Sequence, residues 1–412
     1  MPPVKTKAVN RQPRAGASQA AKTAVQQTTA RVREMHHAIA SKSFSVVRRV
    51  PLLAGPTRLV QIVHDGIVGG VYQAIHHTSG ILLEAAALIE ERRSREEAPP
   101  QGPARLAARM RSVLNGIFGD HLAATDNRLA IEMTLRHDGK ALPLDGDSLR
   151  AALPDAGRRL CLFIHGLACD ECSWRPHSTA AGGTAEVDFA RQLQADFGYT
   201  PLHLRYNSGL PISRNGRELA VLLERLIVAW PQPDSEMVIV GHSMGGLVAI
   251  AACEHATATG MNWPQATRML ICLGAPQLGA PLERLGHLVT SALQMSTVTL
   301  PLGRIAAARS QGIRDLRHGP GATQAHPAAG HIAYRFLGGS LAEDVEHRFG
   351  RLFGDGLVTL GSATAPAIAD DVQTAAQGRL GHLALLTDAC VYQQIAEWLA
   401  GLDEPPAAAD HD

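Results

Sequence analysis

The pentapeptide Gly241-His242-Ser243-Met244-Gly245 places a serine hydroxyl at the centre of a Gly-x-Ser-x-Gly pattern. An apolar run at 237–240 precedes it, and a helix-forming run at 246–252 follows it. A strand, this turn and a helix make a nucleophile elbow, in which the serine backbone is strained and the hydroxyl is exposed. Glycines flank the serine because a Cβ there would collide with the neighbouring strand and helix. We therefore predict that Ser243 is a nucleophile.

The elements around this turn indicate an α/β fold. Short apolar runs alternate with segments of helical length from about residue 158 onward. Such alternation predicts a mostly parallel central sheet with helices on both faces. Asp138-Gly139, between two apolar runs, predicts a β-hairpin further upstream. The expected strands are 160–164, 202–206, 237–240, 269–273 and 332–337, and the expected helices include 187–196, 214–230 and 246–259.

A nucleophilic serine needs a histidine base, an acid that orients it and donors for the oxyanion. In enzymes with this elbow, the acid and then the histidine follow the serine in the chain. His382 lies just before the expected final helix at 389–399, so we predict that it is the base. His331 precedes the last clear strand and would lie at the wrong end of the sheet. The other histidines of this region are His326 and His347, the latter in a charged stretch where we expect it to be solvated.

The best candidate for the acid is Asp355, which lies between Gly354 and Gly356. Two glycines allow a tight turn that brings the carboxylate inward. A surface turn is the alternative role, because Asp-Gly is also a turn signal. Asp344 is closer to the strand end, whereas Asp370 and Asp371 are expected to be an exposed acidic pair.

The oxyanion donors are predicted from the turn after the first expected strand. His165-Gly166-Leu167 follows the run 160–164. In this type of site one donor comes from such a turn and the other from the residue after the nucleophile. We therefore predict that the backbone N–H groups of Leu167 and Met244 form the oxyanion hole. His165 precedes the serine in the chain, so we expect it to shape the turn.

At these residues the chain resembles the α/β-hydrolase superfamily. More narrowly, it resembles lipases and esterases of the type that includes the GPI inositol-deacylase (PGAP1-like) and lecithin–cholesterol acyltransferase groups. The run 273–280 is similar to a Gly-Thr-Pro-His turn of such lipases, with Ala275 and Gln277 in place of the threonine and histidine. The other matching segments are 165–167, 241–246 and 354–358 with the downstream His382.

The resemblance covers roughly residues 155 to 402. It implies an α/β-hydrolase fold and cleavage of a carboxylic ester through an acyl-enzyme, with no metal and no organic cofactor. The insertion after Pro281 contains several apolar residues, among them Leu285, Leu288 and Leu293. Its position is one that commonly carries a lid, and an apolar lid would suit a lipophilic ester. The alternative is a peripheral helix pair.

The N-terminal third has a different composition. Its first residues are basic and contain no acidic side chain before Glu34, which predicts a disordered tail. A transit peptide and a segment that binds an anionic surface are alternatives. The helical region after it is expected to pack on the main domain, with direct lipid contact as the alternative. The expected organisation is a tail at 1–33, a helical extension at 34–103, a connecting segment with the hairpin at 104–154, a catalytic domain at 155–402 with the lid-like insertion at 281–330, and a disordered tail at 403–412.

The composition of the chain limits the classes of molecule that it is expected to bind. A net charge of +1 and an aromatic content of 4% argue against nucleic acid as the main partner. No secretory signal or apolar run of membrane-spanning length is visible, so a cytoplasmic location is expected, with peripheral contact to a membrane or lipid surface left open. Cys169 and Cys172 have the spacing of a disulfide or redox pair. No second such pair exists, so a structural zinc site is not expected.

Three functions fit these residues. The first is hydrolysis of carboxylic esters, most of all lipophilic ones, by Ser243, His382 and Asp355. The second is acyl transfer by the same residues to an alcohol instead of water. The third is a non-catalytic protein that binds lipids or a partner, although the complete set of three residues argues against it.

Overall fold

The structure, a computed structural model, describes residues 103–127, 129–176, 186–280, 310–318, 330–345, 347, 350, 354–364 and 371–403. The chain divides into two compact units, Met1–Ala107 and Ala108–Asp412, and nearly all of the described residues belong to the second unit. The predicted tail at 1–33, the extension at 34–103 apart from Pro103, and the tail at 403–412 apart from Asp403 lie outside the described residues. The same is true of most of the predicted lid at 281–330.

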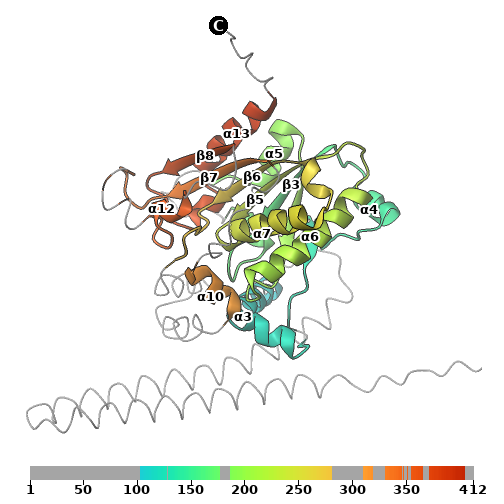
Figure 1. Cartoon of the computed structure of the whole chain (residues 1–412), viewed down its shortest axis with the longest axis horizontal. Coiled ribbons are helices and arrows are strands. Elements are labelled where there is room, and N and C mark those ends of the chain that lie inside the picture. Colours follow the sequence, from blue (N-terminus) through green and yellow to red (C-terminus); the bar gives the residue numbers. More distant parts are fainter. Residues whose placement is uncertain are drawn as a thin grey trace, which may run out of the picture. The chain divides into compact units, whose positions relative to one another are not determined.

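An eight-stranded, mostly parallel sheet organises the described part of the chain (Figure 1). Its strand order is β2-β1-β4-β3-β5-β6-β7-β8. The strands from β3 to β8 are parallel, whereas β1 pairs antiparallel with both β2 and β4. Their bounds are β1 Thr134–His137, β2 Lys140–Ala141, β3 Arg159–Ile164, β4 Thr200–Arg205, β5 Glu236–His242, β6 Thr267–Leu273, β7 Ala333–Gly339 and β8 Val372–Gln377.

The predicted hairpin is confirmed. It joins β1 and β2 through Asp138 and Gly139, whose φ angles are 49° and 80°. Two central residues with positive φ match the right-handed twist of the paired strands, which is why Asp-Gly favours this turn.

Helices cover both faces of the sheet (Figure 1). Side chains alternate across a strand, so Leu160 and Leu162 of β3 enter one core and Cys161 and Phe163 enter the other. The first core includes apolar residues of α6 and α7, and the second includes those of α5 and α13. The helix bounds are α3 Pro103–Ala124, α4 Gly146–Ala152, α5 Phe189–Phe197, α6 Ile212–Ala229, α7 Met244–Thr259, α10 Gln311–His318, α12 Leu360–Ala363 and α13 Ala389–Asp403, and the short 3₁₀ helices are η1 Glu171–Trp174, η2 Trp263–Ala266 and η4 Ala384–Leu386.

Local sequence explains where these helices begin and end. The carboxylate of Asp188 accepts the N–H of Arg191 and caps α5, which ends at Gly198 in a left-handed conformation. Gly260 ends α7 in the same way. These glycines let the chain turn from each helix toward the next strand.

The predicted α/β-hydrolase fold is confirmed by this sheet. All five expected strands are present, with bounds that differ by a few residues. The sequence did not predict β8, because its residues Val-Gln-Thr-Ala-Ala-Gln form a largely polar edge strand without a continuous apolar run. It also did not predict that α3 contributes Val113 and Ile117 to the first core.

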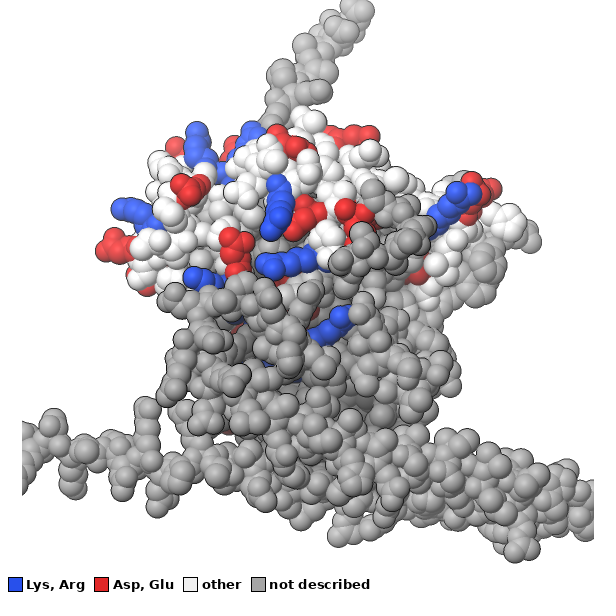
Figure 2. Space-filling model, turned by 180° about the vertical axis from the view of Figure 1, so that it is seen from behind, with Lys and Arg blue, Asp and Glu red and all other residues white. Residues whose placement is uncertain are grey.

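The described surface carries both charges. On the face seen in Figure 2, basic and acidic side chains are interspersed, in keeping with the net charge of +1. Within the described residues, no helix combines the length and hydropathy needed to cross a bilayer.

The contact between α6 and α7 gives a stability prediction. A Cβ added at Gly216 of α6 would lie 2.7 Å from the Cβ of Ala251 of α7. We expect Gly216→Ala to lower the free energy of unfolding by about 1–2 kcal/mol, because overpacking outweighs the gain in helix propensity of about 1 kcal/mol. Urea denaturation measures this change.

Gly401→Ala in α13 is the matched control. An added Cβ there would meet no described atom within 4 Å, so only the propensity gain remains and stability should be unchanged or higher. Equal effects of the two substitutions would contradict the close packing of α6 on α7.

Candidate active site

Ser243 lies in the turn between β5 and α7, as predicted. Its φ of 54° and ψ of −122° are strained for a residue with a Cβ, at a cost of about 1–3 kcal/mol. Its N–H donates to the carbonyl of Leu273 at the end of β6 over 2.8 Å. This hydrogen bond ties the strained turn to the neighbouring strand, so the serine is fixed at the carboxyl edge of the sheet.

The flanking glycines are required by close approach, as the sequence predicted. A Cβ at Gly241 would lie 2.6 Å from the Cα of Gly246, and a Cβ at Gly245 would lie 2.3 Å from the carbonyl oxygen of Ile164. The first collision is with α7 and the second is with the end of β3. Only glycine lets the turn pass between these elements.

The expected exposure of the Ser243 hydroxyl is wrong, because Ser243 is only 2% exposed. Neighbouring segments approach the elbow closely. A Cβ at Gly166, after β3, would lie 3.1 Å from the Cβ of Ser243, and a Cβ at Gly312, in α10, would lie 2.9 Å from the Cε of Met244. The turn after β3 therefore packs against Ser243, and α10 packs against the neighbouring Met244.

The structure brings Asp355 and His382 into direct contact. The His382 Nδ1 and the Asp355 Oδ2 are 2.7 Å apart, and both residues are buried. A second link runs between the backbones, where the N–H of His382 donates to the carbonyl of Asp355 over 3.1 Å. Asp355 follows β7 and His382 follows β8, so the pair joins two loops at the same edge of the sheet.

The other oxygen of this carboxylate is also satisfied. Asp355 Oδ1 accepts the N–H groups of Leu357 and Val358 over 2.9 and 2.8 Å. Because a carboxylate accepts, a neutral His382 ring carries its proton on Nδ1 and keeps a lone pair on Nε2. Within the described residues this buried Nε2 has no hydrogen-bond partner. The ring therefore has the tautomer that a general base requires.

Two contacts connect this pair with the elbow. Gly274 follows the Leu273 carbonyl that holds Ser243, and a Cβ there would lie 3.2 Å from His382 Cε1 and 3.1 Å from Asp355 Oδ2. His242, which precedes Ser243, donates from Nε2 to the carbonyl of His382 over 3.0 Å. Asp355, His382 and the elbow thus converge at one edge of the sheet.

The predicted oxyanion donors lie beside the same turn. Met244 is the first residue of α7, where a backbone N–H has no acceptor within the helix. Leu167 follows Gly166, whose close approach to Ser243 is described above. Among the described residues, neither the Leu167 N–H nor the Met244 N–H has a hydrogen-bond acceptor. Both are therefore available to a developing oxyanion.

The turn after β3 is fixed by a buried ion cluster. Glu171 lies in η1 and accepts the Arg205 Nε over 2.7 Å, and Arg136 Nε lies 3.0 Å from its other oxygen. Burial alone would raise the pKa of Glu171, but the two guanidinium groups lower it. Arg205 belongs to β4 and Arg136 to β1, so the cluster anchors this turn to two strands.

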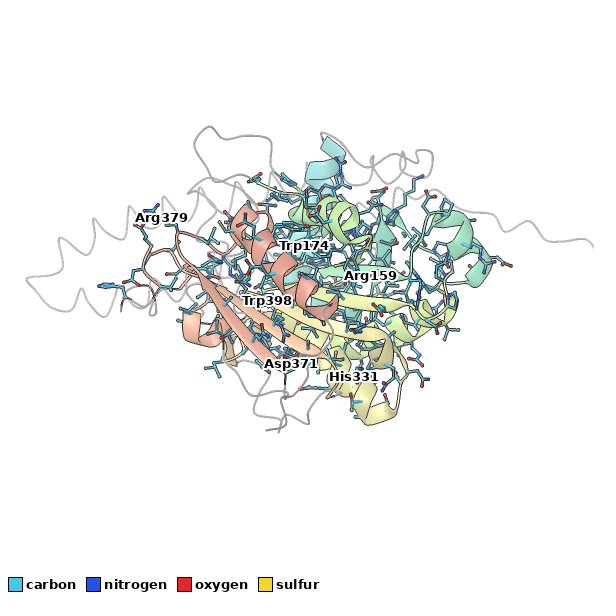
Figure 3. All side chains as sticks on the ribbon, turned by 90° about the horizontal axis from the view of Figure 1, so that it is seen from above. Arg159, Trp174, His331, Asp371, Arg379 and Trp398 are labelled. Carbon is cyan, nitrogen blue, oxygen red and sulfur yellow. The ribbon has the colours of Figure 1, made fainter. Side chains whose placement is uncertain are left out.

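The rejected candidates lie elsewhere. His331 Nε2 is 2.8 Å from the carbonyl of Pro264 at the amino ends of the strands, and Asp371, just before β8, pairs with Arg335 over 2.7 Å. Figure 3 shows both at the end of the sheet opposite to Arg379, which follows β8. Asp344 and His347 are exposed, and His326 lies outside the described residues.

Cys169 and Cys172 are both free thiols, so the structure does not contain the disulfide considered for this pair. Burial raises the pKa of Cys169 to about 11, which disfavours a reactive thiolate. Within the described residues, no group of three histidine, cysteine or acidic side chains could hold a metal ion.

Residues 159–298 match the family model of the PGAP1-like alpha/beta domain. This segment is similar to the PGAP1-like alpha/beta domain. It contains the elbow and the turn after β3, but it ends before Asp355 and His382. The resemblance expected from the motifs is therefore confirmed for about a third of the chain.

Several solved structures align with part of this chain. A lipase of Bacillus licheniformis, BlEst2 in its mature form, is 20% identical, with 59% of this chain and 91% of that chain covered and a TM-score of 0.42. A thermophilic esterase of Thermogutta terrifontis is 16% identical, covers 60% of this chain and 92% of its own, and has a TM-score of 0.38. The type II thioesterase YbtT of a yersiniabactin pathway is 14% identical, and the alignment covers 60% of this chain and 91% of that chain. Its TM-score is 0.34. No curated protein matches the sequence.

Three histidines with lowered pKa values predict a pH dependence of stability. Burial lowers the pKa of His165 and of His203 to about 4, and burial together with His382 lowers the pKa of His242 well below its usual value. Below about pH 6.5 the unfolded chain binds protons that the folded chain does not. We expect the free energy of unfolding to fall between about pH 6.5 and pH 4, by about 1.4 kcal/mol per pH unit for each histidine.

Urea denaturation at several pH values measures this slope. His203 stacks on Phe163 outside the predicted catalytic set, so His203→Gln should remove about one third of the slope and leave the direction unchanged. A free energy of unfolding that stays constant from pH 7 to pH 5 would contradict the lowered pKa values of these histidines.

Proposed function

We propose that this protein is a serine hydrolase that cleaves carboxylic esters through Ser243, His382 and Asp355. The observation that carries the proposal is the buried hydrogen bond between His382 Nδ1 and Asp355 Oδ2 beside the strained elbow. This bond leaves Nε2 as an acceptor, which is the state needed to take a proton from a serine. The PGAP1-like domain match, which includes Ser243, also supports a hydrolase.

The reaction follows from these roles. His382 Nε2 takes the proton of Ser243 as its Oγ attacks the ester carbonyl carbon. The oxyanion of the tetrahedral intermediate accepts the N–H groups of Leu167 and Met244. His382 then gives the proton to the leaving alcohol, which departs from the acyl-enzyme. Water, deprotonated by the same ring, attacks the acyl group and releases the acid.

Asp355 keeps the imidazole in the required tautomer and stabilises the cation that forms during each step. Its two backbone hydrogen bonds from Leu357 and Val358 hold the carboxylate in place. No metal ion and no organic cofactor takes part in this scheme.

The proposed substrates are lipophilic esters. The support for this class is the apolar sequence of the insertion after Pro281, which includes Leu285, Val289 and Leu293. Its place in the chain, after the loop that follows β6, is where a lid over the acyl group would arise. Peripheral contact with a membrane or lipid surface would accompany such a substrate.

Ester hydrolysis by the purified chain tests the proposal. We expect p-nitrophenyl butyrate, octanoate and laurate to be hydrolysed, with the longer chains preferred. Ser243→Ala should lower kcat by about 10³-fold or more, and Asp355→Asn should lower it by about 10²–10⁴-fold.

Asp371→Asn is the matched control for Asp355→Asn, because Asp371 is paired with Arg335 at the opposite edge of the sheet. It should keep activity close to that of the wild type. Equal activity of the wild type and Ser243→Ala would overturn the hydrolase proposal and favour a non-catalytic binding protein. A preference for butyrate would overturn the lipophilic substrate only, and an added alcohol that collects most of the acyl group would identify an acyltransferase.

A further inference from the structure

Ala168 has an unusual backbone conformation next to a proposed oxyanion donor. Its φ is 59°, a left-handed value that is uncommon for a residue with a Cβ. It is buried and directly follows Leu167. A strained buried residue persists only where its surroundings fix it. The contacts that fix Ala168 therefore also restrain the peptide group that joins it to Leu167.

The first of these contacts is a hydrogen bond to a side chain. The N–H of Ala168 donates to the Oγ of Ser208 over 3.0 Å. Ser208 follows β4 and is only 1% exposed. This bond satisfies the buried Ala168 N–H. The N–H of the next residue, Cys169, bonds within the turn to the carbonyl of Gly166.

The second contact comes from α3. A Cβ at Gly116 of α3 would lie 2.8 Å from the Cβ of Ala168 and 2.9 Å from its Cα. The helix backbone thus packs directly against the strained residue. The carbonyl of Gly116 also accepts the hydroxyl of Ser310 over 2.8 Å, just before α10.

The segment that carries Ser208 is clamped to the same helix. Asn207 donates from Nδ2 to the carbonyl of Gly119 over 2.9 Å. A Cβ at Gly209 would lie 2.1 Å from the carbonyl oxygen of Asn115. Residues on both sides of Ser208 therefore contact α3, and the hydroxyl has little freedom to move away from Ala168.

We propose that Ser208 is a positioning residue for the oxyanion hole. Its hydroxyl holds Ala168 in the left-handed conformation, α3 supports the turn from behind, and the Leu167 N–H is thereby kept in the direction that a developing oxyanion needs. This inference rests on the proposed hydrolase function. Loss of the hydroxyl would leave the buried Ala168 N–H unpaired, so the turn would relax and the Leu167 donor would shift.

The Leu167 N–H stabilises the transition state more than the bound ester, because the negative charge on the oxygen develops only as the serine attacks. We therefore expect Ser208→Ala to lower kcat for p-nitrophenyl octanoate by about 10–100-fold, less than the loss of a whole donor, while KM changes less than about twofold. Ser112→Ala is the matched control. Ser112 is also a buried serine, but its hydroxyl bonds to the carbonyl of Ala108 within α3, so both constants should stay near the wild-type values.

Amide hydrogen exchange gives a second readout that does not need activity. In the 412-residue chain, the Ala168 amide should exchange faster in Ser208→Ala than in the wild type or Ser112→Ala. Unchanged exchange and unchanged kcat in Ser208→Ala would overturn the inference and leave the hydrolase proposal standing. A wild type that hydrolyses no ester would overturn the hydrolase proposal, and faster Ala168 exchange in Ser208→Ala would then still support Ser208 as the residue that holds the turn.

Discussion

The strained conformation of Ser243 is the constraint on which the rest of the site depends. A positive φ at a residue with a Cβ is unfavourable, so it must be held by its neighbours. The close packing around the elbow does this, because α7 leaves room only for glycine at Gly241 and the end of β3 leaves room only for glycine at Gly245. The hydrogen bond from Ser243 to Leu273 completes the restraint. The order of the strands therefore determines where the hydroxyl is placed.

The remaining groups reach the serine from loops at the carboxyl edge of the sheet. Ligands of parallel sheets bind at this edge, because the loop after each parallel strand begins there. Leu167 follows β3, Gly274 follows β6, Asp355 follows β7 and His382 follows β8. His242 links two of these loops through its bond to the His382 carbonyl.

The sequence predicted the elements that have strong local signals. The elbow has a fixed five-residue pattern, and Gly354-Asp355-Gly356 marks a tight turn, so both Ser243 and the partner of His382 could be identified from short segments. The edge strand β8 lacks an apolar run and was not predicted. Neither the burial of Ser243 nor the contact of Ser208 with Ala168 could be predicted, since both arise where segments far apart in the chain approach through glycines such as Gly116, Gly166 and Gly312. A short sequence pattern does not indicate contacts between such distant segments.

The central claim is that Ser243 is a nucleophile activated by the His382–Asp355 pair. The most direct test is intact-protein mass spectrometry after reaction with a fluorophosphonate probe, followed by peptide mapping. The account predicts one adduct per chain, located on Ser243, in the wild type and no adduct in Ser243→Ala. An unlabelled wild type, or equal labelling of Ser243→Ala, would contradict it.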